Sequence, residues 1–137
     1  MDVTAIPFNR FLGLRASETA LLLPADPKYL NHLGTVHASA QFSLAEAASG
    51  QWLLDRFGAA AAEYAAVVRR ADLKFRRPAT GELTAQASAP PEEAERFLET
   101  LTRRGRATME VRVEVLAADG SATLESVFEW FAQRIGE

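Results

Sequence analysis

The sequence predicts an α+β fold in which one long, apolar helix is enclosed by a curved, mostly antiparallel sheet. Two observations lead to this prediction. Four segments in the second half of the chain alternate apolar and polar residues with a period of two, which is typical of strands with one buried face. In contrast, residues 37–57 carry a single charge in their first 18 positions, although a helix at a protein surface needs a polar face.

The clearest strands are residues 107–115 and 122–130, where apolar and polar side chains alternate along each segment. The pair Asp119-Gly120 lies between them and suits the positive φ angles of a tight hairpin. Because a turn this short joins antiparallel neighbours, we expect the two strands to pair.

Two further strands are expected over residues 67–77 and 82–87, joined by the turn Pro78-Ala79-Thr80-Gly81. Residues 14–23 are predicted as a fifth strand, apolar on both sides toward its end. The side chains expected to face the core of the sheet are Val67, Ala71, Leu73, Phe75, Leu83, Ala85, Ala87, Ala107, Met109, Val111, Val113, Val115, Ala122, Leu124, Phe128 and Trp130.

Three helices fit between these strands. The helix over 91–104 starts with a proline, has two glutamates in its first turn and two arginines in its last, and lies between the third and fourth strands. A short helix over 7–12 and the long one over 37–57 each stop at a glycine. At about 20 residues the long helix spans roughly 30 Å, enough to cross the sheet. A long central helix held by such a sheet is the arrangement of a hotdog fold.

Length and composition exclude several classes of protein. The 137 residues, 48% hydrophobic and 24% charged, fit one domain over 1–137 and exclude a disordered chain. The absence of cysteine excludes a disulfide scaffold and a cysteine nucleophile. A net charge of −3 argues against a nucleic-acid partner. Because we find no membrane-length apolar run and no signal peptide at the start, we expect a soluble cytoplasmic protein.

Thirteen of the 15 basic residues are arginine. This bias has two explanations. It can reflect the base composition of the genome, or it can serve phosphate recognition by forked guanidinium groups. Only the positions of the arginines in the fold can decide between them.

The residues most suited to chemistry gather at the start of the long helix. Both histidines, His32 and His37, fall within six residues next to Asn31, and Glu46 follows two and a half turns later. Burial would raise the pKa of Glu46 and suit it to act as a base or nucleophile, although it could instead reach solvent or pair with an arginine. The amides near His37 and Ala38 suit an oxyanion, because a helix N-terminus leaves N–H groups free.

Asn31 could orient a water or a carbonyl, or it could simply hold its loop by hydrogen bonds. His37 has the same two interpretations, while His32 is interpreted as structural. Phe8, Phe11 and Phe42, together with Trp52, could line a pocket for an acyl group, although plain core packing is the simpler expectation for them.

The spacing of Asn31, His37 and Glu46 resembles that of the hotdog-fold acyl-CoA thioesterases of the phenylacetate-pathway (PaaI-like) type. The segment from Ala71 to Gly81 also resembles the family's next strand, with its Phe-x-x-Pro-x-x-Gly turn. The resemblance implies hydrolysis of an acyl-CoA, or less commonly of an acyl carrier protein. Glu46 would activate water or attack the carbonyl, the Ala38 amide would hold the oxyanion, and His37 and Asn31 would position the thioester and the water.

One departure from the family is Ala38, because a glycine normally follows the histidine. Alanine keeps the N–H group, but its Cβ narrows the room for a thioester carbonyl. The resemblance also implies a homodimer whose two sheets join edge to edge, or a dimer of such dimers. Lys74, Arg76 and Arg77 would then face the CoA phosphates across the dimer. No cofactor is expected beyond CoA, which is part of the substrate, and no metal or membrane partner.

Two alternatives stay open at this point. One is a hydratase or dehydratase of acyl thioesters, which also pairs a histidine with a carboxylate but with a different spacing. The other is a non-catalytic module that binds or senses acyl-CoA, in which Glu46 is structural and Ala38 has closed the site to chemistry.

Overall fold

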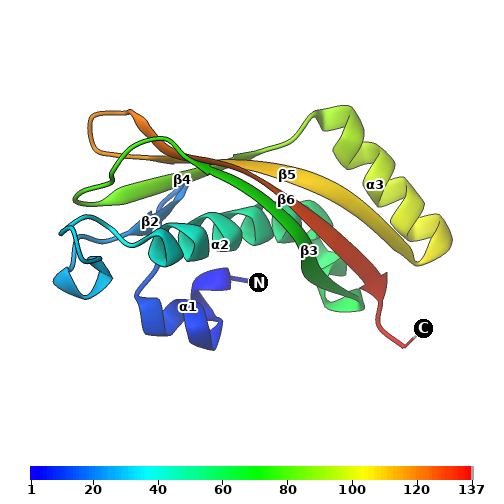
Figure 1. Ribbon diagram of the computed structural model, residues 1–137. Coiled ribbons are helices and arrows are strands. Elements are labelled where there is room, and N and C mark those ends of the chain that lie inside the picture. The colour runs from blue at the N-terminus through cyan, green and yellow to red at the C-terminus, as the bar shows by residue number, and fades with distance from the viewer. Residues whose placement is uncertain (137) are drawn as a thin grey trace.

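Six antiparallel strands curve around one long helix in the computed structural model, which describes residues 1–136 (Figure 1). The strand order across the sheet is β1-β2-β4-β5-β6-β3, and every neighbouring pair is antiparallel. The strands are β1 (Arg15–Ala16), β2 (Leu21–Leu23), β3 (Tyr64–Phe75), β4 (Leu83–Ser88), β5 (Arg106–Leu116) and β6 (Ala122–Arg134). This confirms the predicted fold class, a hotdog arrangement with one added helix.

The helices are α1 (Pro7–Leu12), α2 (Ala38–Phe57) and α3 (Pro91–Arg104), with 3₁₀ turns at Val3–Ala5, Pro27–Tyr29 and Gly58–Glu63. Their ends confirm the sequence prediction. Both α1 and α3 stop at glycines in the left-handed conformation, Gly13 at φ 77° and Gly105 at φ 74°. The helix α2 begins directly after His37 and ends before Gly58. No helix within residues 1–136 is long and apolar enough to span a membrane.

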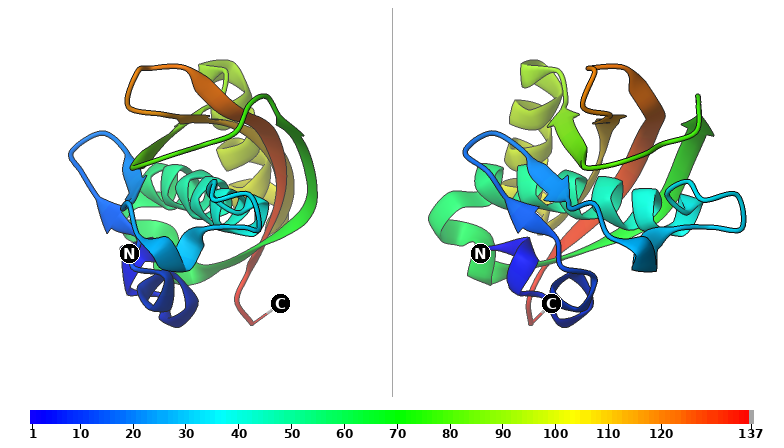
Figure 2. Two further views of the ribbon diagram at one scale, coloured as in Figure 1. Left: turned by 60° about the vertical axis from the view of Figure 1, so that its left-hand side comes forward. Right: turned by 90° about the vertical axis from the view of Figure 1, so that its left-hand side faces the viewer.

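The sheet wraps around α2, and the core lies between them (Figure 2). Small side chains in the middle of α2 let the sheet approach closely, which explains why this helix lacks an ordinary polar face. A Cβ atom added at Gly50 would lie 3.2 Å from the ring of Trp130 on β6. Phe128 on β6 is fully buried in the same core. Truncating such a phenylalanine to alanine costs about 3–5 kcal/mol.

The inserted helix α3 covers the part of β5 that β4 does not reach. Only Arg112–Leu116 of β5 pair with β4, and α3 packs against β5 before that point. Its apolar stripe is buried, and the ring of Phe97 stacks on Phe57 at the end of α2 with centroids 6.0 Å apart. The helix α3 therefore closes the core at the end of α2 that lies away from His37.

The strand β3 departs from the predicted alternation. It starts at Tyr64, earlier than expected, and a β-bulge between Val68 and Arg70 adds one residue to it. The bulge shifts the alternation, so Val68 packs against the core while Val67 is 55% exposed. The prediction that Val67 faces the core was therefore wrong.

Two further predictions need correction. Residues 14–23 form a hairpin of two short strands instead of one strand, because Ser17 hydrogen-bonds Ala20 and turns the chain between them. On β6, Thr123 is one of the polar residues that alternate with the expected core residues of 122–130, but it is completely buried. Its hydroxyl lies 3.0 Å from Gln41 Oε1 on α2, and the β5–β6 register shifts nearby between Val115 and Leu116.

Candidate active site

Glu46 lies on a stripe of α2 that the sheet leaves uncovered. Ser39, Phe42, Ser43 and Glu46 follow one another at helical spacing, and all four are exposed or half-buried. Within residues 1–136 the Glu46 carboxylate has no hydrogen bond or ion pair. Partial burial raises the pKa of this carboxyl above its usual range. Within the described residues of one chain, Glu46 is therefore a partly buried carboxylate without a cationic partner.

The start of α2 offers a free backbone donor. His37 is the N-cap residue, and its Nδ1 accepts a hydrogen bond from the Ser39 N–H at 2.9 Å. This bond leaves the neutral imidazole with its proton on Nε2. The N–H of Ala38, the first helical residue, has no hydrogen-bond partner in the part of the chain that the structure describes. It lies at the positive end of the helix dipole, where a negative oxygen is stabilised.

Asn31 holds the loop before α2. Its Oδ1 accepts hydrogen bonds from the N–H groups of Leu33 at 2.9 Å and Thr35 at 3.1 Å, and its Nδ2 donates to Thr35 Oγ1 at 2.9 Å. The loop is also tied to the turn after β3, because the Val36 N–H donates to the Ala79 carbonyl at 2.8 Å. In one chain, Asn31 is therefore engaged in fixing the backbone that leads to His37.

Two hollows flank the start of α2, and Ser39 and Ser43 line both of them. The first is completed by Ala38, Phe42 and, from β3, Phe75. The second lies toward α1 and is completed by Phe8, Leu12, Lys28, Tyr29, Leu30, His37 and Ala40. The candidate site is thus a shallow, largely apolar surface with His37 and the Ala38 N–H at its centre.

The aromatic residues around this surface are not core residues, contrary to expectation. Phe8 is 59% exposed, Phe11 is 78% exposed and Phe42 is 37% exposed, while Trp52 is partly buried against the core. Phe75 was also expected in the core but is 46% exposed beside Phe42. Hydrophobicity predicted that these side chains would be buried, but one chain leaves Phe8, Phe11 and Phe75 largely uncovered and covers Phe42 only in part, through Phe128.

The structure does not bring the three basic residues of the β3 end to Glu46 within one chain. Lys74 lines a depression on the outer face of the sheet, on the side away from α2. Arg76 donates from Nε to Glu125 Oε2 at 2.9 Å. Hydrogen bonds from Ser121 lower the pKa of Asp119, and the Arg77 guanidinium lowers it further.

Sequence reasoning missed Ser39, Ser43 and the Lys28-Tyr29 pair, which line the hollows. The serines could have been found from their spacing to Glu46, since residues three and four apart share a helix face. Lys28 could not be found from the sequence, because its place beside His37 depends on the path of the loop.

His32 is exposed and lines neither hollow. No cluster of three or more histidine, aspartate or glutamate side chains within residues 1–136 could hold a metal.

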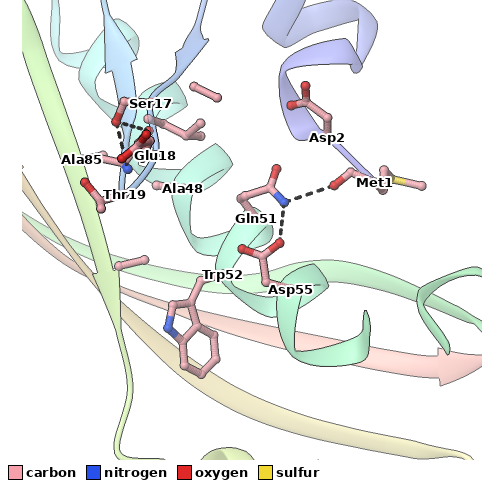
Figure 3. Close-up of a pocket in the computed structure, with 14 residues that line it drawn as sticks. Met1, Asp2, Ser17, Glu18, Thr19, Ala48, Gln51, Trp52, Asp55 and Ala85 are labelled. Atoms are coloured by element: carbon pink, nitrogen blue, oxygen red, sulfur yellow. Dashed lines mark hydrogen bonds between the residues drawn. The ribbon is translucent and has the colours of Figure 1, made fainter. Parts of the chain in front are cut away.

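A further hollow lies elsewhere along α2, between the N-terminus, the β1–β2 hairpin and Trp52 (Figure 3). Gln51 closes one side of it by donating hydrogen bonds to the Met1 carbonyl at 3.1 Å and to Asp55 at 2.9 Å. It contains Trp52, one of the aromatic residues named as possible lining of an acyl pocket, but none of the predicted catalytic or phosphate-binding residues. We interpret it as the place where the N-terminal segment attaches to α2.

Solved structures of other proteins share this architecture. The protein of unknown function PA5026 from Pseudomonas aeruginosa, described as a probable thioesterase, is 27% identical, with a TM-score of 0.83 over 96% of this chain and 91% of its own. Thioesterase HI1161 from Haemophilus influenzae is 14% identical, with a TM-score of 0.71 over 98% and 88%. The BH2602 protein from Bacillus halodurans, solved with CoA, is 17% identical, with a TM-score of 0.70 over 91% and 74%.

No curated protein matches the chain in sequence. The family comparison matches residues 7–131 to a domain of unknown function, DUF4442. The match covers nearly the whole chain, including α1, α2, α3 and the sheet up to Phe131. The chain therefore belongs to the DUF4442 family and has the hotdog fold of its thioesterase-like structural neighbours.

Proposed function

We propose that this protein is an acyl-CoA thioesterase and that Glu46 carries its chemistry. The observation that supports this most strongly is the unpaired, partly desolvated Glu46 carboxylate on the uncovered stripe of α2. The similarity to a probable thioesterase from P. aeruginosa and to a B. halodurans protein solved with CoA supports the substrate class.

Glu46 can act in one of two ways. As a general base it takes a proton from water, whose oxygen attacks the thioester carbonyl; the C–S bond then breaks, giving the carboxylic acid and the CoA thiol. As a nucleophile it attacks the carbonyl itself and expels the CoA thiolate, and water then hydrolyses the mixed anhydride. Both routes need an ionised carboxylate. The raised pKa of Glu46 makes this carboxylate a stronger base than an ordinary glutamate.

The oxyanion donor of this proposal is the Ala38 N–H. Glu46 lies eight residues further along α2, which is about 12 Å along the helix axis. The carboxylate therefore does not touch this N–H, and the two groups can act together only across a substrate carbonyl and its attacking water. His37 borders the same surface and would orient the thioester, with Asn31 holding the loop beneath it.

A second copy of the chain is the expected cover for this surface. The strand β3 lies at one end of the sheet order, and its partner in the described sheet is β6 alone. A 12-residue edge of this kind is a ready template for pairing with another chain. We propose a homodimer joined through β3, or a dimer of such dimers, in which Lys74, Arg76 and Arg77 of one copy approach the CoA phosphates bound by the other.

The second candidate is a non-catalytic acyl-CoA binding or sensing module. It is favoured by Asn31, whose Oδ1 already accepts two backbone hydrogen bonds, and by the Cβ of Ala38 at the oxyanion position. In this case the hollows beside α2 would hold the acyl group without hydrolysis.

Thiol release from a panel of short-chain, aryl-acetyl, benzoyl, medium-chain and long-chain acyl-CoAs separates the two candidates. Because the protein has no cysteine, a thiol-reactive dye reports freed CoA without background. Turnover with any member of the panel supports the thioesterase. Tight binding of acyl-CoA by calorimetry without turnover supports the binding module, and neither binding nor turnover contradicts both.

A further inference from the structure

Another hollow, of about 440 Å³, lies between α3 and the sheet. From α3 it is lined by Glu93, Arg96, Phe97, Thr100 and Arg104, and from the strands by Arg106, Ala107, Thr108, Met109 and Phe131. None of these residues lines the hollows at the start of α2. Phe97 stacks on Phe57 at the opposite end of α2, so this "arginine hollow" is separate from the candidate active site (Figure 1).

The charges around the arginine hollow are unbalanced. Arg96, Arg104 and Arg106 line it, and within residues 1–136 none of the three makes a hydrogen bond or an ion pair through its side chain. Glu93 is the one carboxylate among the lining residues. Guanidinium groups that line one hollow repel one another, and a bound anion offsets this repulsion. This local excess of positive charge occurs in a protein whose net charge is −3.

The floor of the hollow adds an aromatic and apolar surface. Phe131 is half-buried on β6, and the guanidinium of a fourth arginine, Arg69, lies 5.1 Å from its ring centroid. Phe97 and Met109 are buried beneath the opening. Thr100 and Thr108 also line the hollow, and threonine hydroxyl groups are suited to hydrogen-bond a sugar.

We propose that the arginine hollow binds a nucleoside phosphate. Guanidinium forks match phosphate oxygens in pairs, and an aromatic ring beside them provides a stacking surface for the base. The position of the three lining arginines gives part of the arginine-rich composition a specific use. The ligand is either a free nucleotide or the nucleotide end of CoA, which presents the same chemistry. In the second case the arginine hollow takes the role proposed above for Lys74, Arg76 and Arg77 of the other copy.

Calorimetric titration with adenosine 3′,5′-bisphosphate tests the proposal without relying on catalysis. We expect saturable binding that weakens as salt is raised. Arg104→Gln and Arg106→Gln should each weaken it by about three- to tenfold, since each removes a charge-assisted contact. Glu93→Gln should strengthen it. Arg103→Gln is the matched control, because it changes the same charge on the same helix outside the hollow.

No binding by the wild type, or an equal loss in Arg103→Gln and Arg104→Gln, overturns the proposal. Whether the bound nucleotide belongs to CoA is tested by measuring KM for an acyl-CoA and for the matching acyl-pantetheine thioester, which lacks the nucleotide. If CoA supplies it, Arg104→Gln raises KM for the acyl-CoA alone. If a free nucleotide supplies it, both KM values stay unchanged while the bisphosphate affinity falls. An equal rise in both KM values contradicts the proposal, because it places the effect of Arg104 on the thioester end.

Discussion

Trp130 on β6 donates a hydrogen bond from its indole Nε1 to Ser49 Oγ on α2 at 2.9 Å. Ser49 Oγ in turn donates to the backbone carbonyl of Glu46 at 2.7 Å. The sheet thus holds the turn of α2 that carries the candidate catalytic carboxylate. Both Trp130 and Ser49 are buried, so the contact is shielded from water.

Replacing Ser49 by alanine should destabilise the protein by about 1–3 kcal/mol, because it leaves the Trp130 N–H buried without a partner. Trp130→Phe removes that N–H and serves as the second arm of a double-mutant cycle measured by urea denaturation. In the Trp130→Phe background, Ser49→Ala should cost clearly less. Equal costs in both backgrounds would show that the two residues are not coupled.

Ala38→Pro should abolish most of the activity while leaving the fold intact. Proline removes the N–H proposed to bind the oxyanion, yet it is well tolerated at the first position of a helix. The preceding residue, His37, already has φ −60° and ψ 140°, which a following proline accepts. Loss of one oxyanion donor lowers kcat by about 10²–10³.

Ala38→Gly is the matched control for that substitution, because it keeps the N–H and removes only the Cβ. Its kcat should equal or exceed that of the wild type. Thermal unfolding of both variants checks that the helix start is preserved. An Ala38→Pro variant that is folded and retains wild-type kcat excludes this N–H as the oxyanion donor.

His37 serves as a helix cap in the structure, and two substitutions separate this role from any role in chemistry. His37→Ala should lower stability by about 1 kcal/mol through loss of the cap. His37→Asp should restore stability, because aspartate is a strong N-cap residue. If His37 also orients the thioester, the aspartate variant regains the urea midpoint of the wild type while its kcat/KM stays low. If both the midpoint and kcat/KM recover, His37 acts only as a helix cap.

The raised pKa of Glu46 predicts how stability depends on pH. Partial burial favours the protonated form in the folded state, so folding is favoured by protonation. This contribution is complete below the ordinary pKa of 4.5 and is lost as pH rises through the higher folded value. Glu46→Gln does not titrate, so its stability relative to the wild type should increase with pH over that window. Urea midpoints measured from pH 4 to 8 test this, and a constant difference contradicts it.

The elements with complete local signals were the ones that sequence could predict. The strands β5 and β6 alternate regularly around Asp119-Gly120, and α3 has a proline at its start and Gly105 after its end. The strand β3 has no such local signal for its bulge, which arises from pairing with β6, so the prediction for Val67 failed. The exposure of Phe8 and Phe11 also escaped prediction, because hydrophobicity indicates burial without specifying which chain provides the cover.

The candidate site was predictable only where its residues lie close together in the sequence. Asn31, His37 and Glu46 are close enough in sequence for their spacing to identify one region. The hydrogen bonds that occupy Asn31 lie within its own loop, which one of the two interpretations of this residue expected. The pairing of Arg76 with Glu125 instead depends on a contact between distant segments. The arginine hollow joins Arg104 to Phe131 only through the packing of α3 on the sheet, so no local pattern could reveal it.

The most direct test of the thioesterase account compares Glu46→Gln with Asp55→Asn on one acyl-CoA that the wild type hydrolyses. Both changes remove one negative charge from α2, but Asp55 lies nine residues beyond Glu46, where it accepts a hydrogen bond from Gln51 at 2.9 Å. The account predicts that Glu46→Gln lowers kcat at least about a hundredfold while still binding CoA, and that Asp55→Asn keeps wild-type turnover. Wild-type turnover in a folded Glu46→Gln variant would contradict the assignment of Glu46 as the catalytic carboxylate.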